Sequence, residues 1–433
     1  MSPVTAAAFG CKVSRIEALA LSGGLAAGVL PRDVIVVHTC TVTDRADRDV
    51  KRTIRRLRRE RPGAVLVASG CLARRDPESL ARMPEVDLVA GFASGAEIAP
   101  LLAEWDAGLL PLKIAWPTAG APDLAVPTAA ITDPDRTRAF LKVQDGCQRR
   151  CAFCVVPSLR GPERSAEPGA LEDEIRRLGS ADVPEVVLAG VHLAQYGKDR
   201  GTTLAALLRR LEDSPPGCRV RLSSLEPMEA GEELIDLVAS SRVVVPHLHL
   251  PLQSGSDAVL ARMRRGITSA RFRALALRAL RAGARLHLAT DLIAGFPGES
   301  DAEFDETMRL AGEIPFGSLH VFPFSPRSGT HAAFLHASSP VPRAAMALRA
   351  AALRRLGEKQ ARDFRRRADG TVADAVVLRG GRALTDHYLE ARLAPGLAGL
   401  RPGTRLVVRL ATHGETALLT AFDAGEAGTI PPP

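Results

Sequence analysis

The feature that most constrains the fold is a regular alternation of short strand-like runs and helical patterns in the middle of the chain. From Arg138 to about Phe324, each apolar run of strand length is followed by a helical pattern before the next run begins. Six such βα repeats with right-handed crossovers build a parallel sheet that curls into a partial barrel. In such sheets the chemistry collects at the C-terminal ends of the strands. The expected strands are AFLKV at 139–143, EVVLAGV at 185–191, RVRLSS at 219–224, PHLHL at 246–250, RLHLATDLIAGF at 285–296 and GSLHVFPF at 317–324.

The segments on either side of this unit have different patterns. Residues 1–115 alternate β-like runs at 34–37 and 64–68 with helical patterns, which is typical of a small α/β domain. Residues 116–136 hold four prolines and show little periodicity, so we expect a linker there. The predicted class is therefore α/β. It divides into an N-terminal α/β domain, a partial barrel at 137–345, a helical connector at 346–368, and a small β-barrel with a disordered Pro-rich tail at 369–433.

The composition is that of an ordinary globular protein. Hydrophobic residues make up 46% and charged residues 24% of the chain, far from the balance of disordered proteins. The net charge of +8 permits a polyanionic partner without proving one. No uncharged stretch approaches the roughly 18 apolar residues that a membrane-spanning helix needs, and the N-terminus lacks a basic segment followed by an apolar run. We therefore expect a cytoplasmic protein without a membrane partner.

Three of the seven cysteines lie on one short segment. Cys147, Cys151 and Cys154 fall within eight residues, directly after the first expected barrel strand. Because thiols are normally kept reduced in the cytoplasm, metal or redox chemistry is favoured over disulfides. Three soft ligands on one loop suit an iron–sulfur cluster. A 4Fe–4S cluster held by three cysteines keeps one iron open, as a catalytic metal requires.

A second set of cysteines is spread over the N-terminal domain. Cys11, Cys40 and Cys71 are separated by 29 and 31 residues, and this spacing alone leaves a metal site and ordinary buried cysteines equally open. Cys40 and Cys71 follow β-like runs and Cys11 precedes a helical pattern, which allows all three to converge at one edge of a sheet. Cys218 lies outside every motif and is expected to be a free cysteine.

The spacing of the first trio, with Phe153 before its third cysteine, resembles the radical S-adenosylmethionine (SAM) enzymes. That resemblance implies that the open iron is chelated by SAM and that the reduced cluster cleaves SAM to a 5′-deoxyadenosyl radical. Further segments resemble, in the expected order, the methylthiotransferases, a radical SAM subgroup with an additional N-terminal cluster domain. These segments are FGCKVSRIEA, HTCTVTDRADR, ASGCLARRDP, KVQDGCQRRCAFCVVPSLRGPERS, VVLAGVHLAQYG, RLSSLEP, HLHLPLQSGSDAVLARMRRG, DLIAGFPGES and HVFPFSPRSGT.

The resemblance implies cofactors, partners and a reaction. The implied cofactors are SAM and two 4Fe–4S clusters, one on each cysteine trio, and the C-terminal barrel takes the place of the RNA-binding domain called TRAM. HTCTVTDRADR and GVHLAQYG resemble the branch that adds a methylthio group to carbon 2 of N6-threonylcarbamoyladenosine in tRNA. A flavodoxin- or ferredoxin-type electron donor is then required. The alternatives left open are isopentenyladenosine in tRNA, a ribosomal protein aspartate, and an iron–sulfur RNA-binding protein without turnover.

Polar residues near the ends of expected strands are candidates for contacts with SAM. Ser224, Glu226 and Gln253 stand next to Pro or Gly turns, where hydrogen bonds to SAM and turn capping are the two interpretations. Gly190 ends a strand where a side chain would crowd a bound nucleoside, although packing also favours glycine there. Asp291 interrupts an apolar strand and needs a partner, either structural or a ligand. The candidate cofactor-binding residues are thus Phe153, Gly190, Ser224, Glu226, Gln253 and Asp291.

The segment after Cys40 is strongly basic. KRTIRRLRRER at 51–61 holds seven basic residues in eleven, which indicates either a solvated helix face or a phosphate-binding surface. A helix at this place would guide an RNA loop, whose unpaired bases are accessible to an enzyme, toward the cysteines. The candidate RNA contacts are Lys51, Arg52, Arg55, Arg56 and Arg59.

Overall fold

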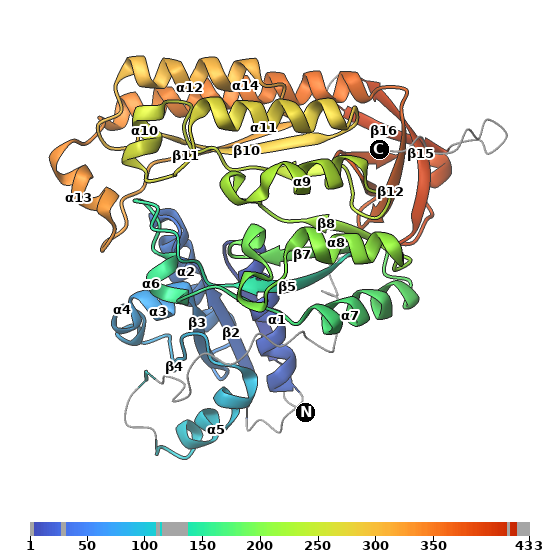
Figure 1. Ribbon diagram of the computed structural model, residues 1–433. Coiled ribbons are helices and arrows are strands. Elements are labelled where there is room, and N and C mark those ends of the chain that lie inside the picture. The colour runs from blue at the N-terminus through green and yellow to red at the C-terminus, as the bar shows by residue number, and fades with distance from the viewer. Residues whose placement is uncertain (1–3, 27–31, 110–112, 115–136, 414–415, 422–433) are drawn as a thin grey trace.

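The computed structural model describes residues 4–26, 32–109, 113–114, 137–413 and 416–421. Figure 1 shows an N-terminal α/β unit (blue) beside a central barrel unit (green to orange), with a small β-barrel (red) at the far end. The expected linker and the expected disordered tail lie outside the described residues. Within the described part of the chain, no helix is long and apolar enough to cross a membrane.

The N-terminal unit is a four-stranded parallel sheet in the order β1-β2-β3-β4. Strands β2 and β3 are buried along their whole length because helices cover both faces of the sheet, which explains their continuous apolar runs. The elements are β1 (Val4–Ala8), α1 (Lys12–Ala26), β2 (Val34–Thr39), α2 (Asp44–Glu60), β3 (Val65–Gly70), α3 (Cys71–Arg75), α4 (Pro77–Ala81), β4 (Leu88–Val89) and α5 (Gly95–Asp106).

The central unit confirms the six parallel strands predicted from the sequence. They run β5-β7-β8 in one sheet and β9-β10-β11 in the next, and a parallel bridge between Val220 and Val244 joins the two; β6 adds a short antiparallel edge. The strands are β5 (Ala139–Asp145), β6 (Arg164–Ser165), β7 (Glu185–Gly190), β8 (Arg219–Leu222), β9 (His247–His249), β10 (His287–Ala294) and β11 (Ser318–Pro323). The helices are α6 (Val156–Arg160), α7 (Pro168–Ser180), α8 (Leu204–Asp213), α9 (Pro227–Ser240), α10 (Asp257–Arg262), α11 (Ser269–Ala282), α12 (Asp301–Glu313) and α13 (His331–Ser338).

The Arg-rich segment forms one long helix, α14 (Arg343–Ala368), which lies along the last barrel strand. A side chain at Gly357 would press on Leu319 of β11, so the helix and the strand approach closely. Gln360 donates from Nε2 to the backbone oxygens of Ala311 and Ile314, 2.8 and 2.9 Å away. The helix therefore covers the outer face of β11 before the chain enters the C-terminal barrel.

The C-terminal strands close into a barrel, as predicted, and the barrel docks at the N-terminal end of the central strands (Figure 1). Arg219 and Arg221 of β8 share the buried carboxylate of Glu185 and donate to backbone oxygens of the small barrel. The ring of Tyr388 packs against His247 with centroids 4.3 Å apart. The strands are β12 (Val372–Leu378), β13 (Arg382–Thr385), β14 (Glu390–Leu393), β15 (Arg405–His413) and β16 (Thr416–Ala421).

Helix α1 of the N-terminal unit packs against the first barrel strands. Val13 and Ile16 form an apolar cluster with Phe140 of β5 and with Val187 and Ala189 of β7. The alternate side chains of these strands face the opposite way, into the core beneath α7 and α8. Helix α1 therefore covers the concave face of the partial barrel at β5 and β7, and Cys11, directly before the helix, lines one small pocket with Phe140 of β5.

Candidate active site between two cysteine trios

The loop that carries the first trio begins where β5 ends. Gly146 has a φ of +77°, and a Cβ there would overlap the backbone oxygen of Pro162, so the tight turn requires glycine. The Cys147 amide donates to the oxygen of Gly161 at 3.0 Å, and the Ala152 amide donates to that of Met263 at 2.9 Å. Backbone bonds thus hold both ends of the loop against the barrel, with Cys147, Cys151 and Cys154 all partly buried.

The surroundings of these thiols suit a metal cluster. Burial, together with the neighbouring Cys151 and Cys147, raises the pKa of Cys154 to about 12, so three thiolates need a bound cation to coexist there. Arg265 points Nη1 at Cys151 Sγ from 3.6 Å, and its guanidinium pairs with Glu226 at 2.7 Å. These donors fit a sulfur-ligated iron cluster, whose sulfurs accept hydrogen bonds from such groups.

The N-terminal cysteines converge as the sequence allowed. Cys11 precedes α1, Cys40 follows β2, and Cys71 opens α3 directly after β3. A side chain at Gly10 would overlap Cys40 Sγ, so glycine is what lets the chain pass this sulfur. Burial, together with the nearby Cys11 and Cys71, raises the pKa of Cys40 to about 12. Ionisation of this trio would therefore also require a bound cation.

A buried ionic network joins the two trios. Arg160 of α6 donates to Cys71 Sγ from 3.6 Å, to Glu17 Oε1 from 2.7 Å, and to Asp145 Oδ1 from 2.9 Å. Lys142 of β5 contacts the same two carboxylates at 2.6 and 2.7 Å. Burial alone would raise the pKa of Glu17, but Lys142 and Arg160 hold it well below its ordinary value. Since Asp145 lies two residues before Cys147, one set of charges connects the Cys71 region to the first barrel loop.

A second ionic contact fastens the basic helix α2 to the end of the barrel. Arg327, which follows β11 and is 2% exposed, pairs with Asp44 at 2.7 Å and with Asp47 at 2.8 Å. The Asp44 amide also donates to Ser325 Oγ at 3.1 Å. The aspartates of the TDRADR segment therefore hold the start of α2 at the C-terminal ends of the barrel strands.

Comparisons with known proteins match the two units that carry the cysteine trios. Residues 141–311 match the model of the Radical SAM superfamily, and residues 4–91 match that of the uncharacterized protein family UPF0004. The threonylcarbamoyladenosine tRNA methylthiotransferase MtaB of Aquifex aeolicus is 34% identical over 83% of this chain and 87% of its own. The MtaB protein of Bacillus subtilis is 36% identical over 77% and 76%. The chain belongs to the radical SAM methylthiotransferases.

A solved structure supports the fold of this methylthiotransferase. The radical SAM methyltransferase TsrM from Kitasatospora setae, with cobalamin and a [4Fe-4S] cluster bound, aligns with a TM-score of 0.50. The alignment covers 75% of this chain and 72% of that one at 13% identity, so the likeness concerns the fold alone.

Two of the predicted cofactor-binding residues of the methylthiotransferase belong to one hydrogen-bonded chain inside the barrel. Ser224 Oγ lies 2.5 Å from His249 Nδ1, and His249 Nε2 lies 2.9 Å from Asp291 Oδ1. His320 of β11 contacts the same oxygen through Nδ1 at 3.1 Å. Although burial raises the pKa of Asp291, the two histidines hold it below its ordinary value. The partner that Asp291 needed is therefore a pair of histidines, which use the carboxylate as a shared acceptor.

The other predicted cofactor-binding residues have separate surroundings. Glu226 pairs with Arg265 beside Cys151, and Phe153 packs in an apolar cluster with Phe296 and Phe324. Gln253 adopts a φ of +76°. Its backbone N–H donates to the oxygen of Asp291 in β10, and its backbone oxygen accepts from the amide of Ile293 in the same strand. A Cβ at Gly190 would come within 3.0 Å of Gln144, so close packing against that side chain already accounts for glycine here.

The predicted RNA contacts lie on α2. Arg52, Arg55, Arg56 and Arg59 are exposed, whereas Lys51 turns toward Ser79 and donates to its Oγ at 2.6 Å. Arg52 and Arg56 pair with acidic residues of the same helix. Arg59 has no ionic partner within the described parts of the chain, and the same is true of Arg48 near the start of the helix.

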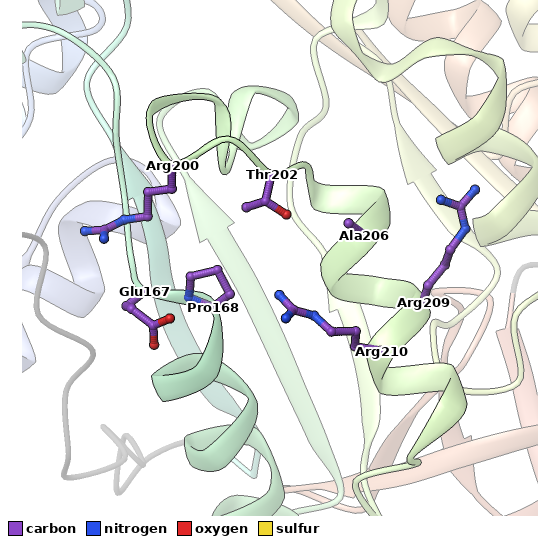
Figure 2. Close-up of a pocket in the computed structure, with 7 residues that line it drawn as sticks. All are labelled: Glu167, Pro168, Arg200, Thr202, Ala206, Arg209 and Arg210. Atoms are coloured by element: carbon purple, nitrogen blue, oxygen red, sulfur yellow. The ribbon is translucent and has the colours of Figure 1, made fainter.

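A separate cavity of about 640 Å³ lies between the start of α7 and helix α8 (Figure 2). Arg210, whose guanidinium Figure 2 shows directed toward Pro168, pairs with Glu172 at 3.0 Å, and Arg209 pairs with Glu233. None of the predicted site residues lines this cavity.

Sequence reasoning missed several residues of the site. Glu17, Arg160, Arg265 and His320 lie far apart from one another in the sequence, and only the fold brings Glu17, Arg160 and Arg265 to the trios and His320 to Asp291. Each stands inside a segment that resembles the family, which was the available signal.

Proposed function

We propose that this methylthiotransferase converts N6-threonylcarbamoyladenosine in tRNA to its 2-methylthio derivative, using SAM and two 4Fe–4S clusters. The clusters are assigned to Cys147, Cys151 and Cys154 and to Cys11, Cys40 and Cys71. The observation that carries the proposal is the network around Arg160, which holds the two trios at one junction between the N-terminal unit and the barrel. The substrate is the one named for the relatives in Aquifex aeolicus and Bacillus subtilis.

The barrel trio supplies the radical chemistry. Cys147, Cys151 and Cys154 would hold a 4Fe–4S cluster with one open iron, which, when bound and reduced by a flavodoxin- or ferredoxin-type donor, would supply the electron for cleavage of SAM to a 5′-deoxyadenosyl radical. Arg265 places a positive charge beside this cluster and is itself neutralised by Glu226. Helix α1 fills the concave face beneath the loop with Val13 and Ile16, and thereby keeps water from that side.

The basic face of α2 supports an RNA substrate. Arginine binds phosphate with two parallel hydrogen bonds, and such contacts position a nucleic acid without reading its sequence. Because Arg327 fixes the start of α2 at the end of the barrel, an RNA held along this helix would meet the strand ends. A single-stranded anticodon loop has the unpaired bases that a barrel mouth can accept.

The test is nucleoside mass spectrometry of tRNA from cells with and without the gene. The proposal expects that deletion removes the 2-methylthio nucleoside and that N6-threonylcarbamoyladenosine accumulates in its place. Re-expression of the wild-type chain should restore the product, while the Cys147→Ala, Cys151→Ala and Cys154→Ala variant should not. An unchanged threonylcarbamoyl pool would refute the substrate assignment and direct the search to isopentenyladenosine or to ribosomal protein.

A further inference from the structure

We propose that Phe322 is the platform on which the reacting nucleobase of the RNA stacks at the mouth of the barrel. The inference rests on the proposed tRNA function and assigns the binding site of the base within it. Phe322 is the second-to-last residue of β11, and its side chain is 44% exposed, although large apolar side chains on barrel strands are mostly buried. An exposed aromatic face beside the proposed reaction site is a surface on which an unpaired RNA base can stack.

The pleat of β11 shows which way this ring faces. Leu319 and Val321 pack into the core under α14, on the outer side of the strand. His320 points the other way and bonds to Asp291 inside the barrel. Because side chains two residues apart share a face of a strand, Phe322 lies on the inner side with His320, one step closer to the C-terminal edge.

The floor beneath the ring is polar and already ordered. His249 and His320 approach Asp291 at 2.9 and 3.1 Å, and their ring centroids are 5.1 Å apart. A base that stacks on Phe322 would turn one edge toward this array, where hydrogen-bonding groups are available to it. An aromatic face above a set of polar groups is how unpaired bases of RNA are commonly bound.

The neighbouring charge favours a nucleic acid as the occupant. Three residues beyond Phe322, Ser325 Oγ accepts from the amide of Asp44, the first residue of α2. The exposed arginines of α2 therefore begin beside the mouth, and Arg48 and Arg59 have no acidic partner within the described residues. A phosphate backbone along this helix, with one base turned into the mouth, matches both the positive charge and the exposed ring.

The experiment uses the full-length, iron- and sulfide-reconstituted protein and an anticodon stem-loop with fluorescent 2-aminopurine at the target adenosine. Stacking on an aromatic ring quenches this fluorophore, so the signal does not depend on turnover. The variants are Phe322→Leu, which keeps an apolar side chain without a ring, and Phe322→Tyr, which keeps the ring. Phe334→Leu is the matched control, because Phe334 is an aromatic residue of α13 that is 72% exposed.

We expect Phe322→Leu to bind the stem-loop about tenfold more weakly and to lose most of the quenching. Phe322→Tyr and Phe334→Leu should match the wild-type protein, and SAM affinity should be unchanged in all three variants. Unaltered quenching in Phe322→Leu, or a weaker affinity for SAM rather than for RNA, would overturn the assignment, as would an equal loss in Phe334→Leu. Failure of the wild-type protein to bind the same stem-loop carrying N6-threonylcarbamoyladenosine in place of 2-aminopurine would instead refute the proposed function.

Discussion

Replacing Glu17 by glutamine removes one of two negative charges from the network that joins the N-terminal unit to the barrel. In the wild-type protein, the carboxylates of Glu17 and Asp145 balance the cations of Lys142 and Arg160. All four side chains are at most 15% exposed, so solvent screens the charges only weakly. The substitution leaves Lys142 and Arg160 to share the single carboxylate of Asp145, which Arg164 also contacts at 3.3 Å.

The cost follows from the contacts that remain. Breaking a buried ion pair by removing one partner costs about 3–5 kcal/mol. Asp145 still lies 2.7 Å from Lys142 and 2.9 Å from Arg160, so we expect the lower end, about 3 kcal/mol. This cost lowers the free energy needed to detach α1 from the barrel. Opening of this helix therefore becomes about 100-fold more frequent, since 1.4 kcal/mol corresponds to a tenfold change.

Hydrogen–deuterium exchange followed by mass spectrometry measures this opening directly. In Glu17→Gln, the amides of α1 should exchange about 100-fold faster, while those of the C-terminal barrel keep their wild-type rates. The matched control is Glu60→Gln, which removes an exposed carboxylate that pairs with Arg56 at 3.0 Å and should change exchange little. We also expect the variant to cleave SAM but to form less methylthio product, because cleavage needs only the barrel trio.

Exchange rates in α1 within about threefold of wild type would refute the reasoning. That result would mean that the apolar contacts of Val13 and Ile16 hold the helix without help from the charges. Loss of SAM cleavage together with product would equally contradict it, because the damage would then have reached the barrel loop.

Three further outcomes are expected. Replacing Cys147, Cys151 and Cys154 by alanine should lower the bound iron from about eight to about four per chain and abolish SAM cleavage. Replacing Cys11, Cys40 and Cys71 should remove an equal amount of iron and retain SAM cleavage, and Cys218→Ala should lose neither iron nor cleavage. Equal loss of SAM cleavage in both triple variants would contradict the division of roles. Burial lowers the pKa of His287 from its ordinary 6.5 to about 3, so below pH 6.5 the unfolded chain binds a proton that the folded chain does not. Between pH 6.5 and pH 5, the free energy of unfolding should therefore fall by about 2 kcal/mol more in the wild-type protein than in His287→Asn, as measured by chemical unfolding. Identical pH profiles of the two proteins would refute this. Arg59→Gln should weaken RNA binding and reduce the slope of log K against log salt by about 0.7–0.9, as the loss of one phosphate contact predicts. Lys51→Gln should have the smaller effect, because the Lys51 amine already donates to Ser79. An unchanged slope in Arg59→Gln would show that Arg59 does not contact the RNA.

Local patterns were sufficient for much of the fold and for part of the site. Val34–Thr39 and Val65–Gly70 read as strands because parallel strands covered on both faces are apolar throughout. The tight spacing of Cys147, Cys151 and Cys154 indicated a cluster loop because three ligands on one turn are close in any fold. The edge strand Arg164–Ser165 has two residues, too few to leave a pattern in the sequence.

The sequence by itself indicated most of the elements, their order, and the one short loop that carries Cys147, Cys151 and Cys154, because these depend on periodicity and on side chains close together in the chain. Only the tertiary structure decided how the trios meet. Arg160 reaches both Glu17 and Cys71, which are 143 and 89 residues away, and Arg327 pairs with Asp44 from 283 residues away. No local pattern predicts such an ion pair, because the pairing depends on distance in space. In the sequence, each charged residue taken alone is indistinguishable from an ordinary surface residue. Likewise, the alternation of side chains along β11 predicts that His320 and Phe322 share one face of the strand. Only the packing of α14 on the opposite face shows that the face with His320 and Phe322 is the inner one.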